Sequence, residues 1–453
     1  MSDKKKETLL MTEGSIPRHL IKFAIPLIVG NFFQQTYQLV DMIIVGRCIN
    51  DGGVAIAAVG VGSTFIIMTI GLFSGIAGGA GIVVANAYGA GRMNRVQKSI
   101  VLALRIAVIL SITAAAGFIL LCDWLLDLIN ATEEIIPMAS LYLKIYAVGF
   151  IPTLIYNMGA AILQAMGNSR SPFYYLAVAC VLNIGLDILF MGTLGMGVSG
   201  AALATVLAQV ASMVLVLRKI YAFNQFKSVN NEEDAEDGLA ARIIRFGVPM
   251  GIQTVALGIS NMIIQGHFNQ LGTDVIAAWS IFSKIDGYII LPLLSFSTAI
   301  TNFTGQNYGA GKLERIRNGK NWVSIMSVGT TILLCLVFLP ICRSVTELFG
   351  ASVSVVDAVW ELALYMFPGY VILSLMRVYT GLFNGMGKTM VASVTMIFFV
   401  CVVRAVCVSL TFPLLQSMKA IYLTYYVSWA ACLIALILLY HLLIRKQLVG
   451  KKK

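Results

Sequence analysis

AYGAGR at residues 87–92 returns as NYGAGK at residues 307–312, a spacing of 220 residues. At the same offset, LQAMGN at 163–168 returns as FNGMGK at 383–388, and the pair Ala57-Ala58 returns as Ala277-Ala278. Three matches at one ungapped offset indicate that one unit of the chain was duplicated and fused. In a strongly apolar chain, such an internal repeat is typical of secondary transporters.

The composition places the chain in a membrane. Of its 453 residues, 58% are hydrophobic and only 12% are charged, whereas soluble domains carry about 25% charged residues. The net charge of +11 does not indicate a nucleic-acid partner, because the basic residues lie in short loops between long apolar runs.

The eight cysteines lack Cys-x-x-Cys spacing, and three histidines are too few to complete a zinc site. We therefore expect no cofactor, and the absence of any recognisable catalytic motif predicts that the protein is not an enzyme.

Twelve apolar runs are long enough to span a membrane, since crossing the hydrocarbon takes roughly 20 residues. They are centred near residues 33, 68, 108, 148, 182, 208, 256, 289, 328, 368, 400 and 430. The sequence therefore predicts an all-α polytopic membrane protein with twelve transmembrane helices. We expect a six-helix lobe at 1–220, a polar, acidic linker at 221–239 and a second six-helix lobe at 240–453. Because each lobe has an even number of helices, a pseudo-two-fold axis along the membrane normal should relate the two lobes.

Lysine and arginine collect in alternate loops between the expected spans. The basic loop residues are Arg92, Arg95, Lys98, Arg170, Lys312, Arg315, Arg317, Lys320 and Lys388. Both chain termini are basic as well. Because basic loops stay on the cytoplasmic side, we expect both termini and the linker to be cytoplasmic.

Two carboxylates fall deep within the expected first lobe. Asp41 shares a helical face of the first span with Gln34, and Asp187 follows Asn183 by one turn in the fifth span. Thr205 in the sixth span reaches a comparable depth. Charged groups within a span are functional candidates because burial in hydrocarbon is costly, and two neighbouring carboxylates cannot both ionise easily. The group suits a proton carrier or, with the neutral oxygens, a Na⁺ site formed by Asp41, Asp187 and Asn183; a purely structural polar cluster is the alternative.

The repeat shows that this carboxylate pair is confined to one lobe. At the 220-residue offset, Asn261 stands opposite Asp41 and Cys407 stands opposite Asp187. An architectural need for buried acids would recur in both halves. The broken symmetry therefore predicts that ion coupling belongs to the N-terminal lobe.

The second lobe has polar residues of its own within the expected spans. Lys284 and Asp286 fall in span eight, Arg377 in span ten and Arg404 in span eleven. Because a buried cation needs a partner, we expect Asp286 to pair with Arg377 or Arg404. A contact with substrate is the alternative.

Aromatic and methionine side chains are abundant, with 23 Phe, 17 Tyr and 20 Met. Such side chains suit flat, lipophilic cations through cation–π contacts and adaptable packing. The candidates for a substrate cavity are Gln34, Tyr37, Phe65, Met68, Phe150, Tyr156, Phe282, Asp286 and Tyr288. Pro26 in the first span predicts either a hinge for a moving helix or a static bend.

These residues together resemble the multidrug and toxic compound extrusion (MATE) family. The resemblance is carried by the first-span face of Pro26, Gln34, Tyr37 and Asp41, by the repeated Tyr-Gly-Ala-Gly loops, by LQAMGN at 163–168, and by Asn183 with Asp187. Within the family, the chain is similar to the bacterial, MepA-like branch. The resemblance implies two six-helix bundles that export drugs in exchange for H⁺ or Na⁺. It also implies a first-lobe cation site at Asp41, Asn157, Asn183, Asp187 and Thr205. Another branch has acids in spans seven and ten, where this chain has Gln253 and Arg377.

The resemblance therefore predicts a secondary antiporter of the bacterial inner membrane that exports lipophilic or cationic small molecules by alternating access. We expect a monomer surrounded by membrane lipid. One alternative is a flippase for lipid-linked glycan precursors, for which Arg377 and Arg404 leave room but which often has two further spans. Another is a membrane receptor or channel, against which the absence of a soluble domain and of a pore-loop pattern argues.

Overall fold

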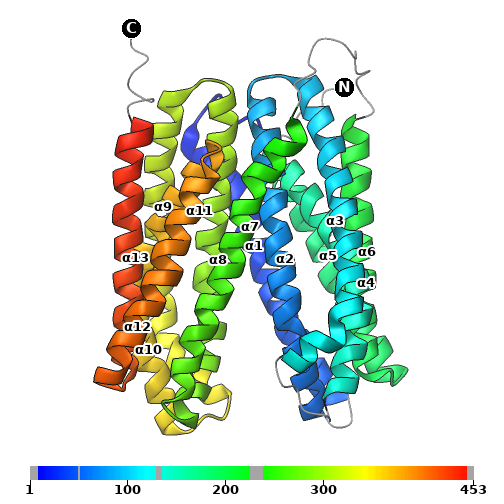
Figure 1. Ribbon diagram of the computed structural model, residues 1–453, viewed down its shortest axis with the longest axis vertical. Coiled ribbons are helices and arrows are strands. Elements are labelled where there is room, and N and C mark those ends of the chain that lie inside the picture. The colour runs from blue at the N-terminus through cyan, green and yellow to red at the C-terminus, as the bar shows by residue number, and fades with distance from the viewer. Residues whose placement is uncertain (1–8, 49–51, 129–134, 225–237, 446–453) are drawn as a thin grey trace. The chain divides into compact units, whose positions relative to one another are not determined.

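The computed structural model describes residues 9–48, 52–128, 135–224 and 238–445. In these ranges every regular element is helical (Figure 1). The helices are α1 (Ile16–Cys48), α2 (Gly52–Gly89), α3 (Met93–Leu128), α4 (Ile136–Ala165), α5 (Arg170–Asp187), α6 (Gly197–Asn224), α7 (Leu239–Asn269), α8 (Thr273–Gly309), α9 (Leu313–Leu348), α10 (Val353–Gly385), α11 (Thr389–Met396), α12 (Arg404–Leu415) and α13 (Met418–Tyr440). Three π-helical segments, Ile188–Thr193, Ile397–Val403 and His441–Arg445, continue α5, α11 and α13.

Long helices lie at all twelve positions where the sequence predicts membrane spans. Eleven helical segments of the described chain are long and apolar enough to cross a membrane, among them 170–193, 389–415 and 418–444, which include the π-helical segments. The remaining long helix is α1, with 33 residues. Each of the twelve expected centres lies within one of these segments, so the predicted all-α polytopic fold is confirmed.

The described chain forms two compact units. The N-terminal unit contains residues 9–10 and Ile25–Gly251, and the C-terminal unit contains Met11–Ala24 and residues 252–445. Two helices therefore change unit along their length: α1 between Ala24 and Ile25, directly before Pro26, and α7 between Gly251 and Ile252. The sequence-based boundaries, 1–220 and 240–453, stay a prediction about domains; the linker at 221–239 falls mostly outside the described residues.

The repeated motifs are helix stops. Gly91 and Gly311 have φ angles of +73° and +70°, a left-handed conformation that glycine adopts without steric cost. The Gly91 N–H donates to the Tyr88 carbonyl over 3.1 Å, and the Arg92 N–H donates to the Ala87 carbonyl over 3.0 Å. This pair of bonds is a Schellman cap, and the same pair recurs at Gly311, Gly167 and Gly387. The duplication has thus preserved the points at which α2, α4, α8 and α10 end.

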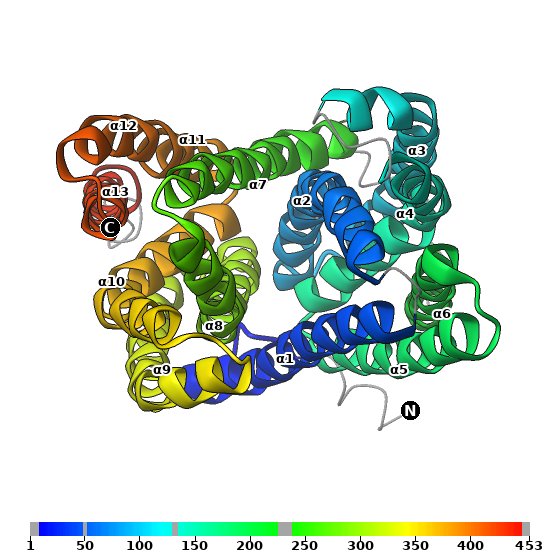
Figure 2. The ribbon, with the colours of Figure 1, turned by 90° about the horizontal axis from the view of Figure 1, so that it is seen from below.

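Each unit is built around one buried helix. In the N-terminal unit α4 packs against α2, α3 and α6, and in the C-terminal unit α10 packs against α8, α9 and α13 (Figures 1 and 2). Both central helices end at a repeated Met-Gly cap. The internal repeat therefore describes the packing of the two units as well as their sequence.

The first half of α7 lies directly on α2 within the N-terminal unit. A Cβ placed on Gly75 would collide with the main chain of Gly251, and one placed on Gly79 would collide with the main chain of Gly247. Glycine on both helices lets their backbones touch, as is common between helices in membranes.

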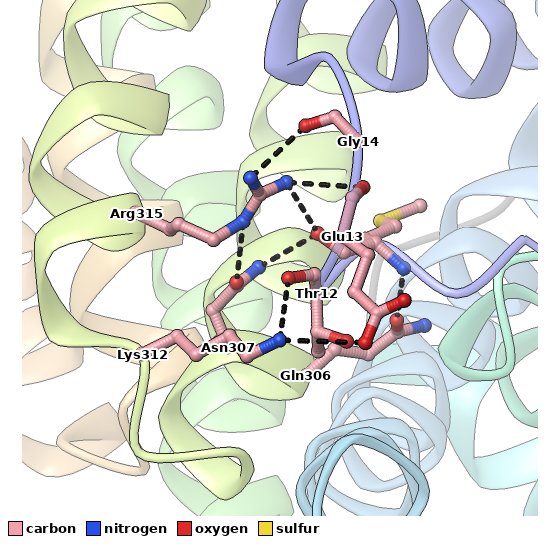
Figure 3. Close-up of polar contacts among 8 residues, drawn as sticks. Thr12, Glu13, Gly14, Gln306, Asn307, Lys312 and Arg315 are labelled. Carbon is pink, nitrogen blue, oxygen red and sulfur yellow. Dashed lines mark hydrogen bonds and ion pairs between the residues drawn. The ribbon is translucent and has the colours of Figure 1, made fainter.

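A short segment of turns and bends precedes α1 and is tied into the C-terminal unit (Figure 3). The Met11 N–H donates to Gln306 Oε1 over 2.8 Å, and Asn307 Nδ2 donates to the Met11 carbonyl over 3.2 Å. Arg315 donates to the carbonyls of Met11 (3.1 Å), Glu13 (3.2 Å) and Gly14 (3.0 Å). Residues 11–14 lack helical hydrogen bonds, so side chains of α8 and α9 satisfy their backbone instead.

Candidate ion-binding site

Asp41 of α1 and Asp187 of α5 meet in the N-terminal unit, as the sequence predicts. Their carboxyl groups are close enough to share a hydrogen bond. Asp187 is fully buried, with 0% of its surface exposed, whereas Asp41 is half-buried. One oxygen of each group, Oδ1, is buried without a hydrogen-bond donor among the described residues. Two carboxyl groups with free acceptor oxygens form a place where a proton or a small cation would be stabilised.

Asn183 and Thr205 extend this pair on the α6 side. With its amide oriented to satisfy both neighbours, Asn183 donates from Nδ2 to Asp187 Oδ2 over 3.3 Å and accepts from the Thr205 N–H over 3.3 Å. The Thr205 hydroxyl donates to the Ala201 carbonyl over 3.0 Å. Asn183 is one turn before Asp187, so the regular geometry of α5 brings both side chains to one face. The structure thus assembles four of the five expected cation-site residues.

Asp187 is also the last residue of regular α-helix in its span. The π-helical segment Ile188–Thr193 begins immediately after it. π-Helical turns widen the backbone and are frequent at functional sites. We did not predict this change of helix type from the sequence.

Asn157 lies apart from the other four. It is half-buried in α4. Tyr146 of the same helix lies within electrostatic range of Asp41, and Asn157 is about 16 Å farther along the helix axis at ~1.5 Å per residue. Asn157 makes no hydrogen bond to either carboxylate in the described part of the chain. Its place in the cation site, which the family resemblance implied, stays a prediction.

Three tyrosines surround the carboxyl pair, and only Tyr37 was expected. Tyr37 lies one turn before Asp41 in α1 and is within electrostatic range of both carboxyls. Tyr142 and Tyr146, one turn apart in α4, also approach the pair, and their rings lie 5.8 Å apart. Sequence reasoning missed both. The signal was present in their four-residue spacing within span four, which places two phenolic groups on one helical face.

The other cavity candidates divide by exposure. Gln34, Phe65, Met68, Asp286 and Tyr288 are half-buried. Phe150 and Phe282, in contrast, are 0% exposed. Phe150 packs edge-on against Phe118 and Tyr146, and Phe282 packs near Trp279 and Phe367. The structure thus places these two in the cores of their units rather than on an accessible surface.

Tyr156 is also buried, and its role in this structure is a structural hydrogen bond. The ring is 8% exposed, and the hydroxyl donates to the Pro172 carbonyl over 3.0 Å. This bond ties α4 to the start of α5.

The expected ion pair of Asp286 with Arg377 or Arg404 is wrong. Asp286 instead accepts a short hydrogen bond from the Tyr370 hydroxyl. Among the described residues neither arginine forms an ion pair with a carboxylate. The reason is that Tyr370 of α10 reaches Asp286 of α8 directly, while Arg404 is turned toward α13, where its Nε donates to Ser428 Oγ over 3.2 Å.

No group of three or more His, Cys, Asp or Glu side chains that could hold a metal ion occurs within the ranges that the structure describes. The donor set at Asp41, Asp187, Asn183 and Thr205 has two carboxyl groups and neutral oxygens. That chemistry fits a monovalent cation or a proton better than a tightly bound divalent metal.

The comparisons with known proteins place the chain in a family. The family model MatE matches residues 26–189 and 249–409, which are corresponding parts of the two halves. The chain belongs to the MatE family. MATE proteins are membrane transporters and not enzymes, so this chain is a multi-pass membrane transporter.

Curated MATE relatives from Bacillus subtilis align with most of the chain. The chain is 28% identical over 310 residues to the probable multidrug resistance protein YpnP, an alignment that covers 67% of this chain and 68% of that protein. It is 29% identical over 341 residues to the probable multidrug resistance protein YoeA, covering 72% and 73% of the two chains.

A solved MATE structure shares the fold. The outward-facing structure of a multidrug resistance MATE transporter of the MOP superfamily has a TM-score of 0.88 and 20% identity, and the match covers 96% of this chain and 97% of that chain. The twelve-helix, two-lobe MATE fold is thus the fold of this chain.

Proposed function

We propose that this MATE protein is a secondary antiporter that exports lipophilic organic cations in exchange for H⁺ or Na⁺. The observation that supports this most strongly is the pair of Asp41 and Asp187, whose Oδ1 atoms are buried without a hydrogen-bond donor in the described chain. An unsatisfied buried acceptor is costly unless a cation or proton occupies it for part of a cycle. The names of the Bacillus subtilis relatives, probable multidrug resistance proteins, agree with drug export.

In the proposed cycle, charge couples the binding of the organic cation to the binding of H⁺ or Na⁺. An organic cation binds while the carboxyl pair is ionised, and binding of H⁺ or Na⁺ at Asp41 and Asp187 then removes the negative charge that favours the cationic drug. Pro26 is the proposed hinge, because α1 changes from one compact unit to the other between Ala24 and Ile25. Alternating access follows when α1 bends differently in the drug-bound state and in the state that has bound H⁺ or Na⁺.

We place the protein in the cytoplasmic membrane of a bacterium, with both termini on the cytoplasmic side. Bacterial relatives and the basic loops support this orientation. In the N-terminal unit, the half-buried side chains of Gln34, Tyr37, Phe65 and Met68 are the proposed contacts for substrate. In the C-terminal unit, the half-buried Tyr288 is the proposed contact.

The test uses purified protein in proteoliposomes that contain a fluorescent lipophilic cation. A ΔpH or a Na⁺ gradient is imposed separately, and dye movement is recorded. We expect one of the two gradients to raise the rate of dye transport at least about tenfold above the rate measured without a gradient. Asp41→Asn should abolish that stimulation. Asp123→Asn is the control, because Asp123 is an exposed acid of the same unit that pairs with Lys144 over 3.2 Å. Full gradient-driven transport by Asp41→Asn would contradict the proposal.

A further inference from the structure

Two arginines within the spans of the C-terminal unit have no carboxylate partner among the residues that the structure describes. Arg377 lies in α10 and Arg404 is the first residue of α12. Elsewhere in this unit an arginine does find an acid, since Arg343 pairs with Asp357 over 3.1 Å. Asp286, the acid that the sequence suggested as their partner, accepts a hydrogen bond from Tyr370 instead. The missing partner is therefore a local feature of this centre.

The surrounding side chains hold Arg404 in one position. Its guanidinium carbon lies 4.3 Å from the ring centre of Tyr425 and 5.9 Å from that of Trp429. Its Nε donates to Ser428 Oγ over 3.2 Å, and the residue is 2% exposed. Cation–π contacts and one neutral hydrogen bond orient the guanidinium, and no ion pair within the described ranges compensates its charge.

Arg377 converges on the same place from α10. Tyr370 and Arg377 are two turns apart on one face of that helix, and the Tyr370 ring lies 5.8 Å from the Trp429 ring of α13. The two arginines are within electrostatic range of each other and of the Cys432 thiol, one turn after Ser428. The two positive charges thus share one site between α10, α12 and α13.

Arg377 is the accessible member of the pair. It is half-buried, whereas Arg404 is almost completely covered. Within the described residues, the Arg377 guanidinium makes no hydrogen bond; only its main-chain carbonyl is engaged, by the Ser297 hydroxyl. A planar, five-donor group within a membrane span, with a second positive charge in electrostatic range, offers paired N–H donors to a carboxylate or phosphate.

The local helix geometry also marks this position. The π-helical segment Ile397–Val403 ends immediately before Arg404, just as another π-helical segment begins immediately after Asp187. At the 220-residue offset, Asn157 and Ile184 stand opposite Arg377 and Arg404. The cationic pair is therefore confined to the C-terminal unit, as the acidic pair is to the N-terminal unit.

We propose that Arg377 and Arg404 form an anion subsite that holds a carboxylate of the transported compound, so that the substrates include zwitterionic and anionic amphiphiles as well as cations. This inference rests on the proposed transport function. It makes Arg377 the contacting residue and Arg404 the residue that raises the local positive potential. A buried like-charge pair is destabilising when empty and is stabilised when a carboxylate lies against it.

The test compares two dyes that differ in one charge: a rhodamine with a free carboxylate and its methyl ester. Transport of each is measured in proteoliposomes made of phosphatidylcholine alone and of phosphatidylcholine with phosphatidylglycerol. We expect Arg377→Gln to raise KM for the carboxylate dye about tenfold, the loss of one charge-assisted hydrogen-bonded pair, and to change KM for the ester less than about twofold. Arg377→Lys should recover part of the affinity, because it keeps the charge but not the fork of donors.

Arg343→Gln is the matched control, since Arg343 is an arginine of the same unit whose partner is the exposed Asp357; it should leave both dyes unchanged. Equal losses for both dyes in Arg377→Gln would assign Arg377 a structural role and overturn the inference. Transport by the wild type of the ester alone would also overturn it, while the proposed cation export would stand. A defect that follows the phosphatidylglycerol content rather than the dye carboxylate would assign the subsite to a lipid headgroup. If the wild type moves neither dye, the proposed function itself fails.

Discussion

The backbone of Met11 is held by the side chain of Gln306, with 2.8 Å between the Met11 nitrogen and Gln306 Oε1, although 295 residues separate the two in the chain. Gln306 lies in the last turn of α8, next to the Tyr-Gly-Ala-Gly cap of the second repeat. Side chains on either side of the second repeated motif, Gln306 and Arg315, therefore anchor the segment that precedes α1 (Figure 3).

Arg315→Ala should release the segment at residues 11–14. The change removes donors to three carbonyls and to Asn307 Oδ1, which lies 3.2 Å from Arg315 Nε. Hydrogen bonds to a charged group contribute about 1.5–3 kcal/mol each at most, and exposure reduces this. We expect the midpoint of thermal unfolding in detergent to fall by several °C, roughly 2–4 °C per kcal/mol. Arg317→Ala, which loses only a 3.7 Å exposed pair with Glu314, should change it by less than about 1 °C.

Asn183→Leu should weaken ion coupling in the N-terminal unit. The change removes the amide that can donate to Asp187 Oδ2 over 3.3 Å, and it leaves a buried carboxyl without that partner. We expect gradient-driven transport to fall about tenfold, which corresponds to one lost buried hydrogen bond. Asn157→Leu is the matched control, and it should stay within about twofold because Asn157 lies farther along α4. Equal losses in the two variants would instead support the five-residue cation site that the family resemblance implies.

Gly247→Val should prevent the close approach of α2 and α7. A Cβ at Gly247 would lie 2.5 Å from the Ile76 Cα, in a place where only backbone could yield. Overpacking of this kind costs about 1–3 kcal/mol or more, so we expect a lower yield of folded protein and a lower unfolding temperature. Gly117→Ala should be neutral or stabilising, since no atom lies within 4 Å of the added Cβ and alanine favours helix. Both are measured by size-exclusion chromatography and thermal unfolding, and an unaltered Gly247→Val would contradict the packing argument.

Gly311→Ala should destabilise the end of α8 through its backbone conformation alone. Gly311 has a φ of +70°, and a Cβ there would meet no atom within 4 Å, so crowding plays no part. A left-handed residue other than glycine costs roughly 1–2 kcal/mol. Gly329→Ala, in the middle of α9 with equally open surroundings, is the control and should not lower the unfolding temperature. If the two variants unfold at the same temperature, the cap at Gly311 has no energetic role.

The carboxyl pair shows how far sequence reasoning reached into the site. Asp41 and Asp187 stand out in a sequence because acids are rare within apolar spans, and Asn183 follows from helical periodicity. Tyr142 and Tyr146 did not stand out, because tyrosines are common near membranes and their orientation depends on how α4 is rotated. The expected partner of Asp286 was wrong for a similar reason. A buried charge requires some partner, but the sequence does not show which side chain lies close enough to be that partner.

By itself, the sequence determined the all-α membrane fold, the duplication, and the points at which the repeated helices end. Apolar run length and the glycine caps are local properties, and they act on residues near one another in the chain. Only the tertiary structure decided that Tyr370 donates a hydrogen bond to Asp286 and that side chains of α8 and α9 bind residues 11–14. It also decided that Arg377 and Arg404 lie within electrostatic range of each other with no ion pair to an acid in the described part of the chain. These contacts join residues tens to hundreds of positions apart, and they depend on helix rotation and packing, which periodicity alone leaves open.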